Sequence, residues 1–570
     1  MKPVRLPASA VLALPRWALF ALAMLYILPG VIGREPWKND DAASFGVMWT
    51  MAHGTWQDWL WPNIAGLSTP EEGPLAFWLG ALCIKLFGGI LGDVLAARVA
   101  TIGVFLLGAL SLWYTTFNLG RRPEAQPLKL AFGGQPEPDD FGRTLADAAL
   151  LIYLGCLGLL QHSHETTAEP LLTALLALTL YRSVRYMEKP CWRNAALIGL
   201  ALGLMTLTRG WVPPVFLLIA LFACTRFLAI PVGRALPHLL ATLAVAFAVM
   251  LPWLVPAFIA RPYGQAPLLA WSVWNIGQVA LPSLRPLQLL LRDGVWFFWP
   301  AWPFALWAAY AWRRQSNLLH IVVPTTFVTM AIVLLLVHPA PERAQLLMLI
   351  PPLAIMAAFG LLTVRRGAIN AIDWFSVMVL TLGAAVLWIF WYAQLTGWPP
   401  KPAHNVLRLI PGYVPEIHWA ALIVAAAATL GWFLLVHWRV SRRPSVLWRA
   451  VVLSSGGVIL IWILWMTLFL PHTNYNKSYA AVARQAAAAL PADTDCVDSN
   501  AGPAQRASFA YFGKLPFRAV DGRACRVLLW QINTRAAEHA NPPGHWTLLW
   551  EGRRASDRTE RFRLYRLDGR

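Results

Sequence analysis

The sequence predicts a mostly α-helical protein that crosses a membrane many times and ends in a small α/β domain outside it. Three observations predict this class. Hydrophobic residues make up 58% of the 570 residues and charged residues 13%, whereas a soluble domain carries about 25% charged residues. Apolar stretches of membrane-spanning length recur along most of the chain. The 31 tryptophans suit membrane interfaces, where indole rings are enriched.

Thirteen stretches have roughly the 17–25 predominantly apolar residues of a membrane-spanning helix. A basic segment precedes the first of them, as in a signal peptide, but no small-residue cleavage site follows, so we expect an uncleaved first helix. The stretches cover residues 17–33, 94–117, 144–161, 170–187, 195–211, 212–230, 236–258, 286–311, 318–338, 344–363, 373–393, 417–438 and 449–470.

The segment 75–91 is also apolar, and the basic loops decide how to interpret it. If the N-terminus is cytoplasmic and 75–91 does not cross, the basic clusters fall inside, as the positive-inside rule requires. We therefore predict that 75–91 lies along the outer interface, as does 56–61. The net charge of +19 is then an orientation signal, and we expect no nucleic-acid partner. The basic clusters include Arg121-Arg122, Arg313-Arg314 and Arg365-Arg366.

Residues 471–570 form a second, more polar region. Strand-like segments at 526–532, 546–550 and 561–567 surround an Ala-rich helical stretch near 478–490, which indicates a small α/β domain. Thirteen spans that begin inside place this domain outside the membrane, where Cys496 and Cys525 could form a disulfide. We therefore predict a transmembrane domain over 1–470, with a first outer loop at 34–93, and an extracytoplasmic domain over 471–570.

Acidic residues gather in the outer loops of this topology. Asp40, Asp41 and Glu71 lie in the first outer loop, and Glu169 lies in the second. Ionisable groups near the bilayer cost free energy and usually serve a function, and a carboxylate can accept a proton from an incoming hydroxyl. We predict these four as catalytic residues. The alternatives are a solvated loop or helix cap for Asp40 and Asp41, and a helix cap for Glu169.

Basic residues lie on the same outer side. Arg209 and Arg343 occur at outer helix ends, and Lys38 precedes the acidic pair. Arginine can hold a phosphate with paired donors, so we predict that these residues bind a donor phosphate. Carboxylates and cations together suit glycosyl transfer from a lipid-phosphate sugar. A headgroup anchor is the alternative for Arg209.

Metal binding is not predicted as a fixed site. His53, His162 and His164 have no spacing that supports a closed metal site. No resident cofactor is therefore assigned, and use of a divalent metal stays open.

A resemblance joins these features. The chain resembles the GT-C fold membrane glycosyltransferases that use polyprenyl-phosphate sugars, in particular the lipid A aminoarabinose transferases and protein O-mannosyltransferase relatives. Glu72 departs from the pattern, because the family has a lysine there. The motifs that carry the resemblance are Glu35-Pro36-Trp37-Lys38-Asn39-Asp40-Asp41, Thr69-Pro70-Glu71-Glu72-Gly73-Pro74, Ala97-Arg98-Val99, Ala168-Glu169-Pro170, Leu207-Thr208-Arg209-Gly210 and Leu251-Pro252-Trp253.

The resemblance implies an integral membrane glycosyltransferase of the bacterial inner membrane with its active site and its domain 471–570 in the periplasm. Its partners would be membrane lipids, a polyprenyl-phosphate sugar as donor, and lipid A, a glycan or a protein as acceptor. The alternative is a lipid-linked sugar flippase or transporter, which would place polar residues inside several helices. The nearly charge-free spans favour the enzyme.

Overall fold

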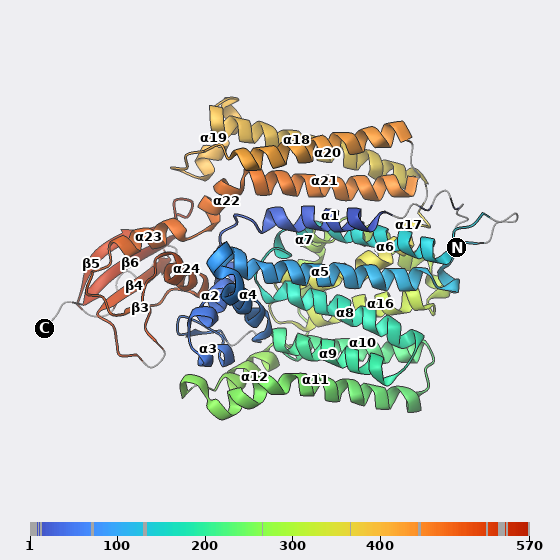
Figure 1. The fold of residues 1–570 in the computed structure, drawn as a ribbon, viewed down its shortest axis with the longest axis horizontal. Helices are drawn as coiled ribbons and strands as arrows, with labels where there is room; N and C mark the ends of the chain where they lie inside the picture. The colour runs from blue at the N-terminus through green and yellow to red at the C-terminus, as the bar shows by residue number, and fades with distance from the viewer. Residues whose placement is uncertain are drawn as a thin grey trace.

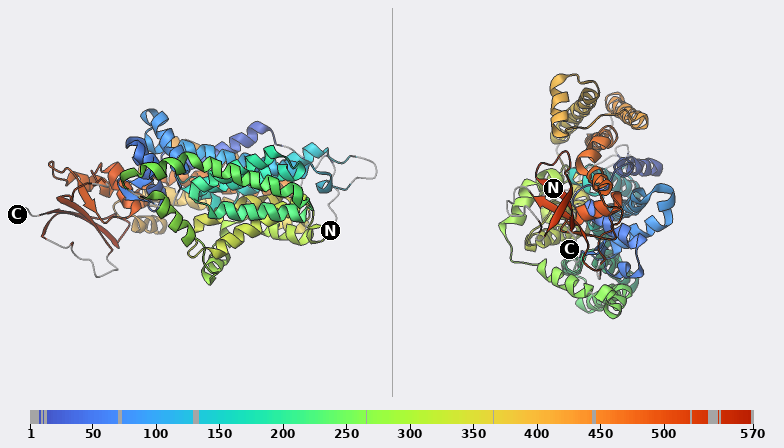
Figure 2. Two further views of the ribbon diagram at one scale, coloured as in Figure 1. Left: turned by 90° about the horizontal axis from the view of Figure 1, so that it is seen from below. Right: turned by 90° about the vertical axis from the view of Figure 1, so that its left-hand side faces the viewer.

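A computed structural model describes residues 8, 11, 14–69, 73–128, 134–264, 266–364, 366–442, 446–519, 522–533, 542 and 545–567. A long helical bundle makes up most of the structure, and a small domain with a sheet lies at one end of it (Figures 1 and 2). The predicted fold class, mostly helical with a small C-terminal α/β domain, is confirmed.

Each of the thirteen predicted stretches contains helix. By length and composition, seven helices within the described residues can cross a membrane; the number thirteen stays a prediction. The bundle helices are α1 (Arg16–Ile27), α5 (Asp93–Gly120), α6 (Pro138–Leu154), α7 (Leu157–His162), α8 (Ala168–Glu188), α9 (Trp192–Arg209), α10 (Val212–Phe227), α11 (Val232–Ala260), α13 (Leu284–Arg292), α14 (Gly294–Phe297), α15 (Ala301–Ala311), α16 (Leu319–Val337), α17 (Ile350–Leu361), α18 (Arg366–Thr396), α20 (Trp419–Arg442) and α21 (Val446–Leu468).

Two of the predicted stretches are not continuous helices, and the first of them, 144–161, is divided between α6 and α7 at Gly155 and Cys156. Residues 286–311 are not one continuous helix but the three helices α13, α14 and α15, with breaks at Asp293 and at 298–300. Pro300 explains the second break, because proline lacks the backbone N–H of a helical hydrogen bond and restricts the residue before it. Asp293 at the first break accepts two hydrogen bonds from Arg343.

Helix α5 lies at the centre of the arrangement, packed against α6 and α8. On one side α9 packs on α11, where Gly199 and Gly203 allow close approach: a Cβ at Gly199 would lie 2.5 Å from the carbonyl oxygen of Thr242. On the other side α18 and α20 pack on α21 (Figure 1). Helices α12 (Pro267–Gly277) and α19 (Pro400–Leu409) are short connecting helices.

The first outer loop folds at the end of the bundle that carries the sheet domain (Figure 1). It contains α2 (Asp40–His53), α3 (Trp56–Leu60), the two-residue strands β1 (Asn63–Ile64) and β2 (Leu67–Ser68), and α4 (Leu75–Leu91). Helix α4 has the predicted bounds 75–91 and packs on α2 and α5. Its outward side chains include Leu86 and Ile90, which are 62% and 86% exposed, as an interfacial helix requires.

The C-terminal domain begins after α22 (Leu470–Lys477) with α23 (Ala480–Ala488) and α24 (Pro503–Phe512). Its sheet has the order β3-β4-β6-β5, with β3 parallel to β4 and the other pairs antiparallel. The strands are β3 (Val497–Ser499), β4 (Val527–Asn533), β5 (Trp546–Gly552) and β6 (Glu560–Leu567). The three predicted strands and the Ala-rich helix are confirmed.

One feature cross-links this domain internally, and another attaches it to the first outer loop. Cys496 and Cys525 form a disulfide that joins the starts of β3 and β4. The buried guanidinium of Arg506 in α24 donates hydrogen bonds to the carbonyl oxygens of Ile64 and Ala65 in the first outer loop, at 3.1 and 2.6 Å. The domain is therefore docked on the loop that carries the predicted catalytic residues.

Candidate active site

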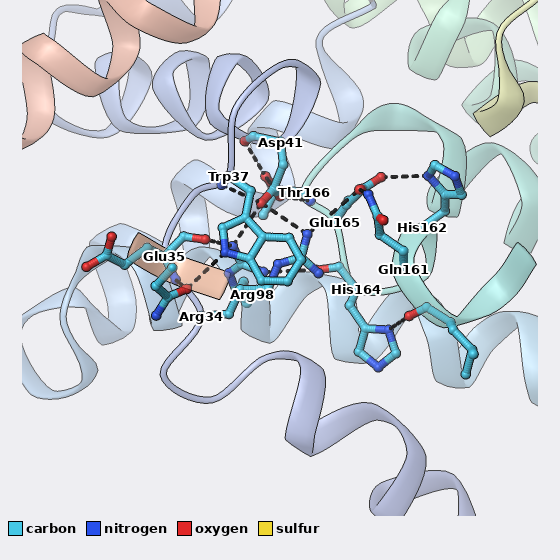
Figure 3. Close-up of polar contacts among 12 residues, drawn as sticks. Arg34, Glu35, Trp37, Asp41, Arg98, Gln161, His162, His164, Glu165 and Thr166 are labelled. Carbon is cyan, nitrogen blue, oxygen red and sulfur yellow. Dashed lines mark hydrogen bonds and ion pairs between the residues drawn. The ribbon is translucent and has the colours of Figure 1, made fainter. Parts of the chain in front are cut away.

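The centre of the site is the carboxylate of Asp41, in the first turn of α2. One Asp41 oxygen accepts hydrogen bonds from Arg98 of α5 at 3.1 Å, from Arg34 at 3.4 Å and from the backbone N–H of Trp37 at 3.2 Å. The other accepts one from the backbone N–H of Thr166 at 2.9 Å. Asp41 is only 3% exposed, and it joins segments that are far apart in the sequence (Figure 3).

The electrostatics of Asp41 make it a weak proton acceptor. Burial raises the pKa of this carboxyl, but Arg98 and Arg34, with the Thr166 and Trp37 hydrogen bonds, lower it to about 2. A carboxylate this acidic, with both oxygens already accepting hydrogen bonds, is a poor general base at neutral pH. Asp41 therefore positions the surrounding loops.

Asp40 has a different environment, although it is the neighbouring residue. It is the first residue of α2 and is exposed, whereas Asp41 is buried. The buried cluster fixes the backbone at Asp41 and so fixes where Asp40 is presented. Of the two acids, Asp40 is the one that a substrate can reach.

A second carboxylate, Glu165, extends the cluster. It accepts hydrogen bonds from Gln161 at 2.8 Å and from the ring of His162 at 2.9 Å, and it lies 3.7 Å from Arg34 (Figure 3). Burial raises the pKa of Glu165, but the hydrogen bond from His162 and the electrostatic effects of His162 and Arg34 outweigh burial. The pKa therefore lies below its ordinary value. Two carboxylates thus face two buried arginines, so the cluster is close to neutral.

Trp37 links this cluster to α22. Its ring centroid lies 3.9 Å from the guanidinium carbon of Arg34 and 4.7 Å from the Nζ of Lys477, and its indole N–H donates to Asn474 at 2.9 Å. The predicted phosphate ligand Lys38 is exposed, and its backbone N–H donates to the carbonyl oxygen of Lys477 at 2.8 Å. The structure therefore brings two lysines to this edge of the site.

The predicted residues Glu169 and Arg209 form an ion pair. Arg209 is the last residue of α9, and its guanidinium carbon lies 6.0 Å from the Trp274 ring. Gly210 follows with a φ of 101°, and a Cβ there would collide with Asn275. A glycine is thus required for the turn that presents Arg209.

Arg209 lines a small apolar cavity together with His338 and Gln345. His338 bonds Gln278 at 2.6 Å and Gln345 at 3.1 Å. Burial, followed by the charge of Arg209, lowers the pKa of His338 to about 4, so the imidazole is neutral at physiological pH. Arg209 is the charged residue that this cavity offers to a ligand.

Arg343 is placed differently from Arg209. Its side chain is 64% exposed and makes two hydrogen bonds to Asp293, at 2.9 and 3.3 Å, and it does not line the Arg209 cavity. The structure therefore does not bring the two predicted arginines to one point, and their shared role stays a prediction.

Glu71 lies outside the described residues. Its neighbour Gly73 donates a backbone hydrogen bond to the carbonyl oxygen of Thr208 at 3.1 Å, which attaches this part of the first loop to the turn before Arg209. Within the described part of the chain, no group of three His, Cys, Asp or Glu residues could hold a metal ion.

Sequence reasoning gave Arg34, Arg98 and Glu165 no role in the site. Arg98 had a usable signal, because it is the one charged residue in the apolar stretch 94–117, and such a residue needs a partner. Arg34 and Glu165 had no comparable signal, because charged residues are ordinary in loops.

A large groove, separate from the Arg209 cavity, borders the loop that carries the cluster. Its volume is about 880 Å³, and it lies between α1, α20, α21, α22 and α23. Apolar side chains such as Leu28 and Met466 line most of it, and Glu35, Asn474 and Ser478 are polar residues of its wall. Glu35 donates its backbone N–H to Asn474 at 3.2 Å. Glu35, of the loop that carries the acidic cluster, thus lines this groove, which is separate from the Arg209 cavity.

Known proteins match this architecture. The sequence profile of the family described as Dolichyl-phosphate-mannose-protein mannosyltransferase matches residues 139–255. The crystal structure of ArnT from Cupriavidus metallidurans bound to undecaprenyl phosphate is 14% identical, with a TM-score of 0.68, and the likeness covers 96% of this chain and 97% of that one. The chain has the GT-C fold. The fold implied by the sequence resemblance is thus confirmed.

Two further solved structures are similar to the chain to different degrees. ArnT from the same organism in the apo state is 15% identical, with a TM-score of 0.67 and coverage of 96% and 97%. The archaeal oligosaccharyltransferase AglB from Archaeoglobus fulgidus, in complex with an inhibitory peptide and a dolichol-phosphate, is 13% identical with a TM-score of 0.36, covering 78% of this chain and 56% of that one. A search of curated proteins found no match.

Proposed function

We propose that this GT-C protein transfers a sugar from a polyprenyl-phosphate donor to an acceptor. The observation that carries the proposal is the exposed Asp40 beside the buried, charge-paired Asp41, in a structure that also has two separate cavities. A transferase with two lipid-borne or bulky substrates needs two sites that meet at one base. The ArnT structure that shares this fold holds undecaprenyl phosphate, which supports the donor class.

The reaction follows from these groups. Asp40 accepts the proton of the acceptor hydroxyl as the oxygen attacks the anomeric carbon of the sugar. The bond between that carbon and the donor phosphate breaks, and the electron pair leaves with the polyprenyl phosphate. Arg209 offsets the negative charge that develops on the phosphate. Release of Glu169 from Arg209 would free the guanidinium for this contact.

We infer that the site faces the periplasm of a bacterial inner membrane. The disulfide between Cys496 and Cys525 supports this side, because disulfides persist in oxidising compartments. The sheet domain and the first outer loop lie at the same end of the bundle (Figure 1), so the acidic cluster shares the compartment of the disulfide.

For the acceptor, the groove favours a lipid such as lipid A over a glycan or a protein. Its wall is mostly apolar along α1 and α20, and Leu25, Ile32 and Val424 in that wall are 54%, 54% and 44% exposed. Exposed apolar walls on two separate helices suit acyl chains that enter from the bilayer.

Purified protein in detergent tests the function directly, because a flippase has no measurable output without two compartments. We expect turnover of a polyprenyl-phosphate sugar in the presence of a lipid acceptor, followed by mass spectrometry of both lipids. Absence of turnover with every donor, together with donor translocation in vesicles, would favour the transporter instead. A lipid profile of a deletion strain, searched for a missing sugar increment, identifies the acceptor.

Replacing Arg209 by alanine should lower donor affinity and rate by about 10–100-fold, since a hydrogen bond to a charged group contributes roughly 1.5–3 kcal/mol. Arg209→Lys keeps the charge but loses the paired donors, and it should retain part of the activity. The donor KM and the kcat of each variant measure these effects on affinity and on rate. Arg343→Ala is the matched comparison. If neither alanine variant differs from wild type, the phosphate is bound elsewhere.

Cysteine labelling tests the proposed side. A cysteine at the exposed position Gln135 should resist an impermeant thiol reagent applied to intact cells, while one at the exposed position Ala519 should react. The parent protein, with half-buried Cys83 and Cys191, gives the background. Labelling of Gln135→Cys from outside would show that the segment 75–91 crosses the membrane and that the orientation is reversed.

A further inference from the structure

A further cavity lies at the end of the bundle away from the sheet domain. It has a volume of about 230 Å³ and runs between α1, α5 and α6. Its apolar wall includes Phe20 and Ala23 of α1, Leu106 of α5 and Leu150 of α6. From Arg16 to Ala23 the slot follows α1 for roughly 10 Å, at 1.5 Å per helical residue. The slot is thus long and narrow, and no part of the proposed reaction uses it.

Two arginines stand at the N-terminal end of this slot. Arg16 begins α1 and is exposed, and Arg143 lies in the second turn of α6 and is half-buried. Within the described part of the chain, neither guanidinium forms an ion pair within 4.0 Å, although their neighbours Arg121 and Arg122 do. Both cations are therefore available to an anion at the mouth of the slot.

The carboxylate near this mouth is already engaged. Asp147 of α6 accepts hydrogen bonds from the indole N–H of Trp113 at 2.8 Å and from the backbone N–H of Leu14 at 2.8 Å. Trp113 is part of the slot wall, and Leu14 leads into α1. Asp147 thus builds the slot by holding a wall residue and the start of α1, and the two arginines leave the mouth with a net positive charge.

We propose that the slot binds an anionic phospholipid. Its phosphate would lie between Arg16 and Arg143, and one acyl chain would follow the apolar wall along α1 and α5. Charge complementarity selects an anionic headgroup, because two guanidiniums meet a phosphate at the membrane surface. The apolar depth selects a lipid over a soluble anion. Beside the slot lie Trp17 and Tyr114, which are 74% and 47% exposed. Tryptophan and tyrosine are enriched at the level of the lipid headgroups.

Such a lipid would also stabilise the active-site end. Helix α1 reaches the site through Tyr26, which stacks on Phe105 of α5 at 5.3 Å and whose carbonyl oxygen bonds the ring of His164 at 3.1 Å. Helix α5 reaches it through Arg98, which binds Asp41. A lipid that fills the space between α1 and α5 therefore braces the two helices that hold the buried cluster.

Native mass spectrometry of the full chain from nanodiscs of phosphatidylglycerol and phosphatidylcholine tests the proposal. Wild type should retain phosphatidylglycerol in preference to phosphatidylcholine. The double variant Arg16→Gln/Arg143→Gln should lose that retention about tenfold or more, since each basic residue at a membrane surface contributes roughly 1 kcal/mol. Added phosphatidylglycerol should raise the Tm of wild type but not of the double variant.

The control variant Arg193→Gln/Arg234→Gln removes the same charge from two exposed arginines that do not line the slot, and it should retain the lipid as wild type does. Equal loss in both double variants, or equal retention of the two lipids by wild type, would overturn the proposal. Glycerol 3-phosphate tests whether a soluble phosphate without an acyl chain is sufficient. If it raises the Tm as much as phosphatidylglycerol does, the proposal that the slot holds an acyl chain is overturned.

Discussion

Replacing Asp40 by asparagine is expected to lower the turnover of sugar transfer by about 10²–10⁴-fold, the usual contribution of a general base. Asparagine has the same shape and no basic oxygen, so the variant should fold and bind both substrates. The effect should appear in kcat with little change in either KM. Rate measurements on purified Asp40→Asn, with wild-type expression and Tm, provide the check.

The control for Asp40 is another acid of the same loop, the half-buried Glu35, which lines the large groove. Glu35→Gln removes the same charge close to the site, and its rate should stay within a few-fold of wild type if proton abstraction belongs to Asp40 alone. Wild-type turnover in Asp40→Asn would refute the assignment of the base.

Sequence patterns predicted best the elements whose ends are marked by nearby proline, glycine or turn residues. Helix α4 has the predicted bounds because Pro74 precedes it and Gly92 follows it with a φ of 76°, which are strong start and stop signals. The strands of the C-terminal domain are short runs rich in apolar and aromatic residues between turn residues, which is a strand signal. The break within 286–311 was missed because apolar composition alone does not reveal where a helix ends.

The sequence predicted acidic residues of the candidate site but not how they are arranged in space. Composition and spacing gave no reason to separate the roles of the adjacent Asp40 and Asp41; the family resemblance alone favoured Asp40, which aligns with the first acid of the motif. The distinction depends on Arg98 and Thr166, which lie 57 and 125 residues away in the chain. Contacts at that separation arise from the packing of α2 against α5 and the loop before α8, which no local pattern encodes. For the same reason, the partners of Arg209 and Arg343 could not be assigned.

Replacing Asp41 by asparagine is expected to destabilise the protein as well as to impair it. Arg98 and Arg34 are 1% exposed each, and in the variant Glu165 would be the carboxylate left beside Arg34. Breaking a buried ion pair by removing one partner costs about 3–5 kcal/mol, because an uncompensated charge stays buried. The amide would also direct an N–H group toward guanidinium donors. We expect a lower Tm in detergent together with a lower rate.

The pH dependence of stability should report the same carboxylate. Its folded-state pKa of about 2 lies below its ordinary value of 3.8, so its stabilisation is present above about pH 4 and is lost as the pH falls toward 2. At neutral pH the wild-type cluster is therefore fully charged. In Asp41→Asn this part of the acid dependence should disappear, while the dependence due to other carboxylates remains.

Asp373→Asn separates the structural effect from the effect on the site. Asp373 is 1% exposed and makes three hydrogen bonds to Arg439 between α18 and α20, in a part of the bundle that contributes nothing to the acidic cluster. Both variants should lose stability, but only Asp41→Asn should lower the rate measured below its own Tm. This comparison is decisive because Asp41 acts through the loop that presents Asp40. If Asp41→Asn keeps the wild-type rate at a temperature where it is folded, the buried cluster stabilises the fold without positioning the base.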